Sequence, residues 1–102
     1  MGQINDLVHE AHVNAFLHGF WEDEPDHGKM LMLIASEVFE AFDALRNGMG
    51  IAQISQTCPE NDSIASKQEG IPVELADCVI RIFDFCGRYG IDLEKVILEK
   101  MA

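Results

Sequence analysis

The stretch MLMLIASEVFEAF, residues 30–42, is apolar at nearly every position, and its acidic side chains are Glu37 and Glu40. Its apolar residues recur with the spacing of a helix, and Gly48 supplies a stop signal, so we predict a helix over residues 28–46. Two carboxylates three positions apart project from the same face of a helix. Such a pair on an otherwise apolar helix indicates a functional site in which the negative charges face a positively charged partner.

A second acidic pair, Glu74 and Asp77, has the same spacing in a second apolar segment, which is predicted to form a helix over residues 72–89. Two like charges about 4 Å apart repel by roughly 4 kcal/mol at an effective dielectric constant of about 20. A divalent cation held by oxygen ligands offsets such repulsion. The two pairs together therefore predict a metal-dependent site.

The remaining sequence predicts an all-α chain that forms one domain over residues 1–102. We expect a first helix over residues 5–18 with Asn5 as its N-cap, and a short last helix capped by Asp92. The polar segment 49–71 contains no convincing strand and is predicted to be a long loop. Four helices are therefore expected.

The two long predicted helices, 28–46 and 72–89, are apolar on nearly every side. A helix that is hydrophobic all round is buried in a large protein or against another subunit. A chain of 102 residues is too small for the first arrangement. We therefore predict a homodimer.

Composition excludes several functional classes. Eighteen acidic residues oppose seven basic ones, so the chain lacks the basic surface that binds a nucleic-acid polymer. The longest apolar run, residues 30–35, is far shorter than the ~20 residues that span a bilayer, and no signal peptide is evident. Three cysteines form no CxxC motif and are expected to be small core residues: Cys58, Cys78 and Cys86. These features favour a cytoplasmic protein.

The order of the motifs resembles the MazG-like, all-α nucleoside triphosphate pyrophosphohydrolases. That family carries an ExxE motif followed by an ExxD motif on the next long helix, matched here by residues 36–41 and 73–77. The segment between the two motifs is longer here than is usual for the family. The likeness covers roughly residues 5–100 and includes His18-Gly19-Phe20-Trp21, Lys29 and Leu45-Arg46-Asn47-Gly48.

The resemblance implies a four-helix MazG-like bundle completed by dimerisation, as a homodimer or a dimer of dimers. It implies hydrolysis of a (deoxy)nucleoside triphosphate to the monophosphate and pyrophosphate, with a house-cleaning role. The implied ligands of Mg²⁺, for which Mn²⁺ is a possible substitute, are Glu37, Glu40, Glu74 and Asp77. Either Glu37 or Glu40 could instead act as the base on the attacking water.

Three of the candidate substrate contacts have a second interpretation. Phe20 and Trp21 could stack on a base, or they could pack into the core. Arg81 could bind a phosphate, or it could pair with an acidic residue of its own helix, Asp77 or Asp84. Further possible contacts to the nucleotide are His18 and Lys29.

Other functions remain open from the sequence. The chain could be a non-catalytic helical oligomer that binds a metal or a nucleotide, or a related pyrophosphohydrolase that acts on dUTP or phosphoribosyl-ATP. A di-iron or manganese bundle needs Glu-x-x-His on two helices, which the acidic pairs do not provide. His9 and His12 are therefore expected at the surface or at an interface. No Walker loop or nucleophile motif is present.

Overall fold

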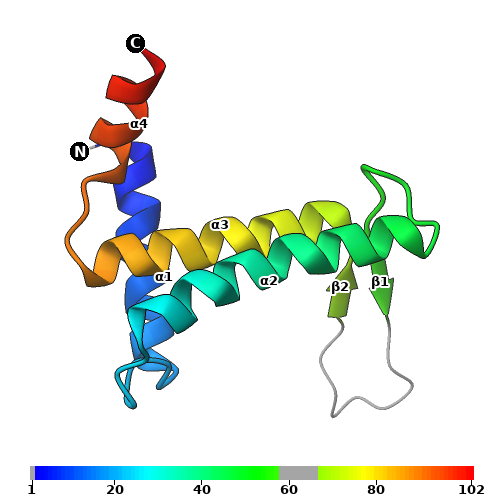
Figure 1. Cartoon of the computed structure of the whole chain (residues 1–102), viewed down its shortest axis with the longest axis horizontal. Coiled ribbons are helices and arrows are strands. Elements are labelled where there is room, and N and C mark those ends of the chain that lie inside the picture. Colours follow the sequence, from blue (N-terminus) through cyan, green and yellow to red (C-terminus); the bar gives the residue numbers. More distant parts are fainter. Residues whose placement is uncertain (1, 58–66) are drawn as a thin grey trace.

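A computed structural model describes residues 2–57 and 67–102 of the chain (Figure 1). The predicted all-α class is confirmed in its main point, because most of the described chain is helical. The prediction that the segment 49–71 contains no strand is wrong, because a short antiparallel hairpin lies there. The elements are α1 (Gln3–Leu17), α2 (His27–Arg46), β1 (Ser55–Thr57), β2 (Lys67–Glu69), α3 (Ile71–Arg88) and α4 (Leu93–Met101).

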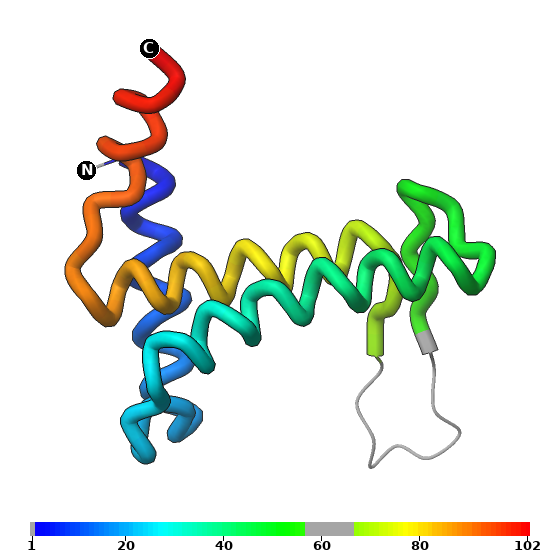
Figure 2. The backbone as a smooth tube through the Cα atoms, in the orientation of Figure 1, coloured from blue at the N-terminus to red at the C-terminus, as the bar shows by residue number. Residues whose placement is uncertain are grey.

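The two long helices, α2 and α3, lie side by side and run in opposite directions (Figures 1 and 2). Helix α1 crosses α3 near its C-terminal end, and α4 packs beside α1. The crossing is close at Gly87, where an added Cβ would lie 2.6 Å from the Cβ of His12. The hairpin lies at the other end of the α2–α3 pair, away from the crossing with α1. None of the described helices is long and apolar enough to cross a membrane.

The start of α1 is capped by a residue far away in the sequence. The prediction that Asn5 caps this helix is wrong, because α1 begins at Gln3 and its N-cap, Gly2, has no side chain to accept a hydrogen bond. The carboxylate of Glu94 instead accepts hydrogen bonds from the backbone N–H groups of Ile4, at 3.0 Å, and Asn5, at 3.4 Å. The first turn of α1 is therefore completed by α4.

The other helix ends follow the sequence signals. Asp26 caps α2 by accepting from the backbone N–H of Lys29 at 3.2 Å, and Asp92 caps α4 in the same way at the N–H of Lys95. Cys78 and Cys86 are buried and not paired in a disulfide, as predicted, whereas Cys58 lies outside the described residues.

Within the described residues, only a few apolar side chains are buried: Val8, Trp21, Met30, Ala41, Cys78 and Cys86. Many large apolar side chains stay exposed on the long helices. Those on α2 and α3 are Leu31, Met32, Val38, Phe39, Phe42, Leu45, Leu75, Val79 and Ile80. A single chain thus leaves much of its apolar helix surface in water.

Gly70, the residue that joins β2 to α3, is expected to tolerate no side chain. Its φ of +137° is open only to glycine, and an added Cβ would overlap the backbone carbonyl oxygen of Gln53. Gly70→Ala should therefore lower the free energy of unfolding by about 3 kcal/mol, measured by urea denaturation. Gly48→Ala is the control, because Gly48 has a φ of +89° but no atom within 4 Å of an added Cβ. A loss of about 1 kcal/mol is expected there. Equal losses would show that the contact with Gln53 is unimportant.

Candidate metal centre and substrate pocket

Three carboxylates from the two long helices converge where α2 packs against the first turns of α3. Glu37 comes from α2, and Glu74 and Asp77 come from the first two turns of α3. Each offers an oxygen atom, and these oxygens all lie within 4.8 Å of one another. The two acidic motifs therefore meet in space. Glu40, the fourth predicted ligand, lies outside this group of three and its side chain is exposed.

Glu37 is the most buried member of the group, with only 7% of its surface exposed. Its Oε1 accepts a hydrogen bond from Nε of Arg81 at 2.8 Å, whereas its Oε2 is buried and has no hydrogen-bond partner. Buried carboxylate oxygens are normally paired. An unpartnered oxygen beside two further carboxylates suits a divalent cation with oxygen ligands, so these residues fit Mg²⁺ or Mn²⁺.

The carboxylates shift one another's pKa. Burial acts to raise the pKa of Glu37, but the hydrogen bond and charge of Arg81, together with the neighbouring Glu40 and Glu74 carboxyls, hold it below its ordinary value. Burial, together with the neighbouring Glu40 carboxylate, raises the pKa of Glu74 to about 7. Burial and the charge of Glu37 likewise raise the pKa of Asp77. Without a metal, the partly buried carboxylates thus repel one another, and their ionised forms are disfavoured at Glu74 and Asp77.

The raised pKa of Glu74 predicts a pH-dependent stability of the metal-free protein. An acid whose pKa is raised by folding contributes stability below its unfolded pKa of 4.5, and that stability is lost as the pH rises through about 7. In EDTA, the free energy of unfolding should therefore fall by about 2 kcal/mol between pH 5 and pH 8. Glu37 has a lowered pKa, so its own contribution changes only below pH 4.5.

Urea denaturation of wild type and Glu74→Gln at a series of pH values tests this expectation. The substitution should remove most of the fall, because glutamine cannot ionise. Mg²⁺ should stabilise the wild type more at pH 8 than at pH 5, since metal ligands must be deprotonated. Parallel stability curves for the two proteins would contradict the assignment of this pH dependence to Glu74.

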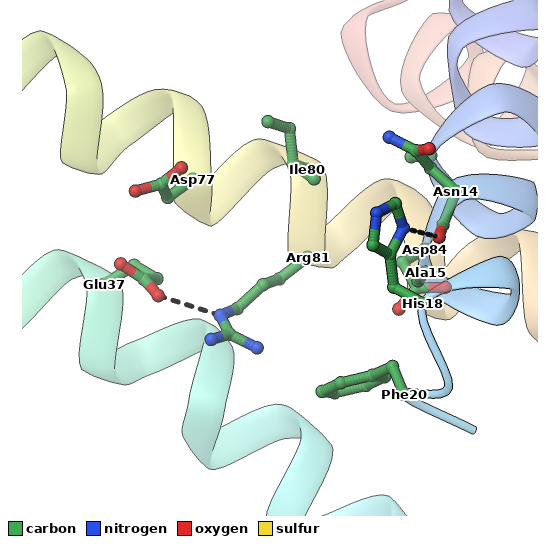
Figure 3. Close-up of a pocket in the computed structure, with 10 residues that line it drawn as sticks. Asn14, Ala15, His18, Phe20, Glu37, Asp77, Ile80, Arg81 and Asp84 are labelled. Atoms are coloured by element: carbon green, nitrogen blue, oxygen red, sulfur yellow. Dashed lines mark hydrogen bonds and ion pairs between the residues drawn. The ribbon is translucent and has the colours of Figure 1, made fainter. Parts of the chain in front are cut away.

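A pocket of about 450 Å³ opens beside the acidic group (Figure 3). Asp77 and Arg81 line it from α3, Glu37 lines it from α2, and His18 and Phe20 line it from the end of α1 and the turn that follows. The guanidinium carbon of Arg81 lies 6.0 Å from the centre of the Phe20 ring. The pocket therefore joins carboxylates, one guanidinium and one aromatic ring, and its volume is typical of a small-molecule site.

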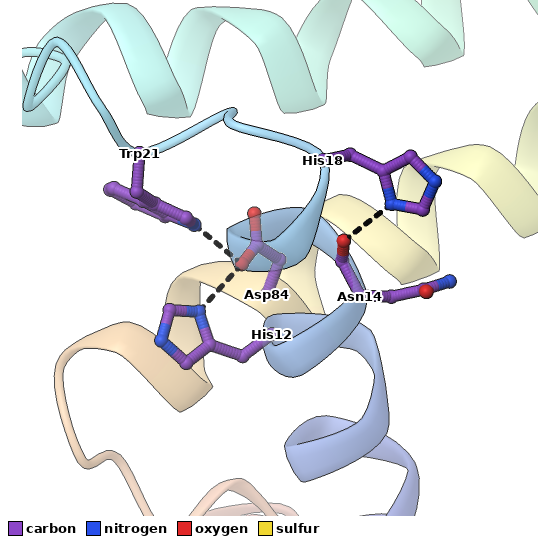
Figure 4. Close-up of polar contacts among 5 residues, drawn as sticks. All are labelled: His12, Asn14, His18, Trp21 and Asp84. Carbon is purple, nitrogen blue, oxygen red and sulfur yellow. Dashed lines mark hydrogen bonds and ion pairs between the residues drawn. The ribbon is translucent and has the colours of Figure 1, made fainter.

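Trp21 does not line this pocket and is 4% exposed. Its Nε1–H donates to Oδ1 of Asp84 at 2.8 Å, and the same oxygen accepts from Nδ1 of His12 at 2.9 Å (Figure 4). Of the two interpretations, packing into the core is the one that the structure shows for Trp21. His12 was expected at the surface or at an interface, and the surface alternative is wrong, because its side chain is 20% exposed and bonded to a buried carboxylate. His9 is exposed.

Of the other candidate residues for substrate binding, Arg81 and His18 line the pocket and Lys29 does not. Arg81 pairs with Glu37 across the two helices, so the alternative of an ion pair within its own helix is wrong. Lys29 is exposed at the start of α2 and does not line the pocket. His18 does line it, with its Nδ1–H donating to the backbone carbonyl oxygen of Asn14 at 2.7 Å (Figure 4).

Asp84 and Asn14, which also line the pocket, were not among the residues that the sequence singled out for a site. Asp84 follows Asp77 by seven residues on α3, so the two share a helix face. That spacing is a signal that could have indicated Asp84. Asn14 carries no comparable signal, because a single amide on a polar helix surface is common.

Comparisons with protein-family models, with curated proteins and with solved structures find no match to this chain. The geometry of the site and the resemblance of its motifs are therefore the grounds for a functional proposal.

Proposed function

We propose that this protein is a Mg²⁺-dependent pyrophosphohydrolase that converts (deoxy)nucleoside triphosphates to the monophosphate and pyrophosphate. The observation that carries the proposal is the group of Glu37, Glu74 and Asp77, with an unpartnered buried oxygen on Glu37. The pocket beside this group offers Arg81 to phosphate oxygens and the Phe20 ring to a base. The order of the ExxE and ExxD motifs, which resembles the MazG-like enzymes, supports the same reaction.

Each part of the site has a separate task in this proposal. Glu37, Glu74 and Asp77 would hold Mg²⁺, which, when bound, neutralises the polyphosphate and lowers the pKa of a coordinated water. Glu40 lies close enough to Glu74 to raise its pKa, yet it is exposed and outside the group of three. Glu40 is therefore the better placed of the two candidate bases. It would accept the proton of the attacking water as the bond between the α- and β-phosphates breaks.

The remaining parts of the proposal concern substrate choice and assembly. A house-cleaning role on unwanted nucleotides in the cytoplasm follows from the resemblance, and dUTP and phosphoribosyl-ATP are alternative substrates of the same reaction type. We also propose that a second copy of the chain completes the helical bundle, as a homodimer or a dimer of dimers. Support comes from the exposed apolar side chains of α2, which has α3 as its one extensive helical partner in the described chain.

Product analysis tests the reaction. A panel of nucleoside triphosphates, with dUTP and phosphoribosyl-ATP included, is incubated with the protein in Mg²⁺, in Mn²⁺ and in EDTA. The proposal expects the monophosphate and pyrophosphate in equal amounts, and no products in EDTA. Release of inorganic phosphate and a diphosphate would indicate cleavage at another bond. Metal-dependent nucleotide binding without any product would favour the non-catalytic binding protein.

The proposed dimer predicts a sensitive position at Phe39, whose side chain is 67% exposed on α2. Phe39→Glu should shift the protein towards a monomer in sedimentation velocity, because a charge placed in an apolar interface stays unpaired. Phe39→Leu is the matched control and should leave the wild-type oligomer intact. A monomeric wild-type protein would contradict the proposed assembly.

A further inference from the structure

Arg81 is hydrogen-bonded to the acidic group. Nε of Arg81 lies 2.8 Å from Oε1 of Glu37, and the charge of Arg81 also opposes the rise in the pKa of Asp77. Lys67 of β2 acts on Asp77 as well, but its side chain is 75% exposed and lies 3.9 Å from Glu69. Arg81 is 32% exposed and extends from α3 towards Glu37 of α2 (Figure 3).

We propose that Arg81 is the internal counter-ion of the metal-free site, which leaves Glu37 when a divalent cation binds and then binds a phosphate of the substrate. This inference rests on the proposed function, because it assumes that the acidic group binds a metal. It adds that Arg81 and the metal compete for the same carboxylate. If Arg81 only contacted phosphate, its presence would not weaken the binding of the metal.

The competition follows from the contacts of Glu37. Oε1 is already bonded to the guanidinium, and only Oε2 is without a partner. A guanidinium hydrogen-bonded to a metal ligand repels a divalent cation at that ligand, through charges a few ångströms apart in a partly buried site. The same cation weakens the electrostatic attraction between Glu37 and Arg81. Binding of either positive group therefore weakens binding of the other, and this coupling is reciprocal.

The pocket provides a position for the released side chain. The bond to Glu37 uses one of the five N–H donors of the guanidinium. Figure 3 shows the terminal nitrogens of Arg81 directed away from Glu37 and towards the side of the pocket where Phe20 lies. A planar guanidinium matches the geometry of phosphate oxygens. Arg81 can thus exchange one anionic partner for another by a movement of its own side chain.

Metal affinity without any substrate gives the decisive measurement. Calorimetric titration of the metal-free protein with Mn²⁺ compares wild type with Arg81→Gln and with Arg88→Gln. Arg88 is a matched control, because it lies on the same helix, is also 32% exposed and pairs with Glu24 at 3.9 Å outside the acidic group. Arg81→Gln should bind Mn²⁺ roughly tenfold more tightly than wild type, within the usual range of coupling between sites. Arg88→Gln should stay within about twofold.

Binding of a non-hydrolysable nucleotide, the α,β-methylene analogue of ATP, gives the second part of the expected result. In Mg²⁺, Arg81→Gln should bind this analogue at least about tenfold more weakly than wild type, since a charge-assisted contact to phosphate is lost. Tighter metal binding combined with weaker nucleotide binding is the pattern that the proposal requires.

A measurement on the wild type covers the case in which Arg81→Gln does not fold without metal. The chain has three arginines, Arg46, Arg81 and Arg88, so their Nε–H signals can be assigned by NMR. The Arg81 Nε–H should be protected from solvent exchange in EDTA and should lose that protection when Mg²⁺ is added. Addition of the α,β-methylene analogue should restore it.

The outcomes separate this inference from the proposed function. Mn²⁺ binding by wild type with unchanged or weaker binding by Arg81→Gln would overturn the inference and leave the metal site in place. An Arg81 signal that stays protected in saturating Mg²⁺ would overturn it as well. Failure of the wild type to bind Mn²⁺ or Mg²⁺ would overturn both.

Discussion

Asp77→Asn is expected to lower the rate of Mg²⁺-dependent nucleotide hydrolysis by at least about a thousandfold, which corresponds to roughly 4 kcal/mol of transition-state stabilisation. Asp77 is one of the three carboxylates whose oxygens converge between α2 and α3. An amide keeps nearly the same shape but loses the negative charge that attracts a divalent cation. The loss should appear in the production of pyrophosphate at saturating substrate and Mg²⁺.

The same substitution is expected to stabilise the metal-free protein. Burial and the charge of Glu37 raise the pKa of Asp77, so the ionised side chain disfavours the folded state near neutral pH. In EDTA, Asp77→Asn should therefore raise the free energy of unfolding by roughly 1 kcal/mol, measured by urea denaturation at pH 8. Loss of activity with a gain of stability is typical of a site that stores unfavourable interactions for function.

Asp43→Asn provides the control for both measurements. Asp43 lies on α2, is 68% exposed and pairs with Arg46 at 3.5 Å away from the acidic group. Its substitution should change neither the activity nor the stability by a measurable amount. If Asp77→Asn kept its activity, the proposed metal site would be wrong. A loss of both activity and stability would instead indicate that Asp77 has a structural task.

Asp84→Ala should have the largest effect on stability, a loss of about 3–5 kcal/mol in the free energy of unfolding. Asp84 is 5% exposed, and its Oδ1 accepts hydrogen bonds from both Trp21 and His12. Its removal leaves the buried Trp21 donor and the partly buried His12 donor without an acceptor and opens a cavity where α1, α3 and the turn after α1 meet. Urea denaturation followed by Trp21 fluorescence measures the loss directly, since Trp21 is the single tryptophan.

Asp84→Asn separates the hydrogen bonds from the charge. The amide oxygen can still accept from both donors, so this variant should lose clearly less stability than Asp84→Ala. Asp43→Ala, an aspartate removed from an exposed helix surface, should cost less than about 1 kcal/mol. Similar losses for Asp84→Ala and Asp43→Ala would contradict a central role for Asp84. Because Phe20 packs edge-on against Trp21, a loosened Trp21 should also weaken nucleotide binding.

The sequence predicted the parts of the structure that depend on local signals. The long helices, the aspartate cap of α4 and the acidic residues at the site follow from apolar spacing and from residues within one turn. The cap of α1 could not be predicted in this way, because Glu94 is 90 positions from Ile4. The hairpin was missed because its strands are three residues long and polar.

The acidic residues that meet at the candidate site were predictable, and their individual contacts were less so. The spacing of Glu37, Glu74 and Asp77 indicated a shared cation, but the exposure of Glu40 depends on how far α2 is rotated against α3. The partner of Arg81 likewise depends on that rotation, because it lies on the other helix. Trp21 had two interpretations until its buried acceptor, Asp84, was known.

The bond between the first and last helices has a consequence for the dynamics of the chain. The amides of Ile4 and Asn5 are bonded to Glu94, and the amide of Glu94 is bonded to the side chain of Asn5 at 3.3 Å. Opening of α4 therefore exposes the first turn of α1, and the two ends should exchange their amide hydrogens as one cooperative unit. Because contacts between residues so distant in sequence close a long loop, we also expect them to form late in folding, after α2 and α3 have paired.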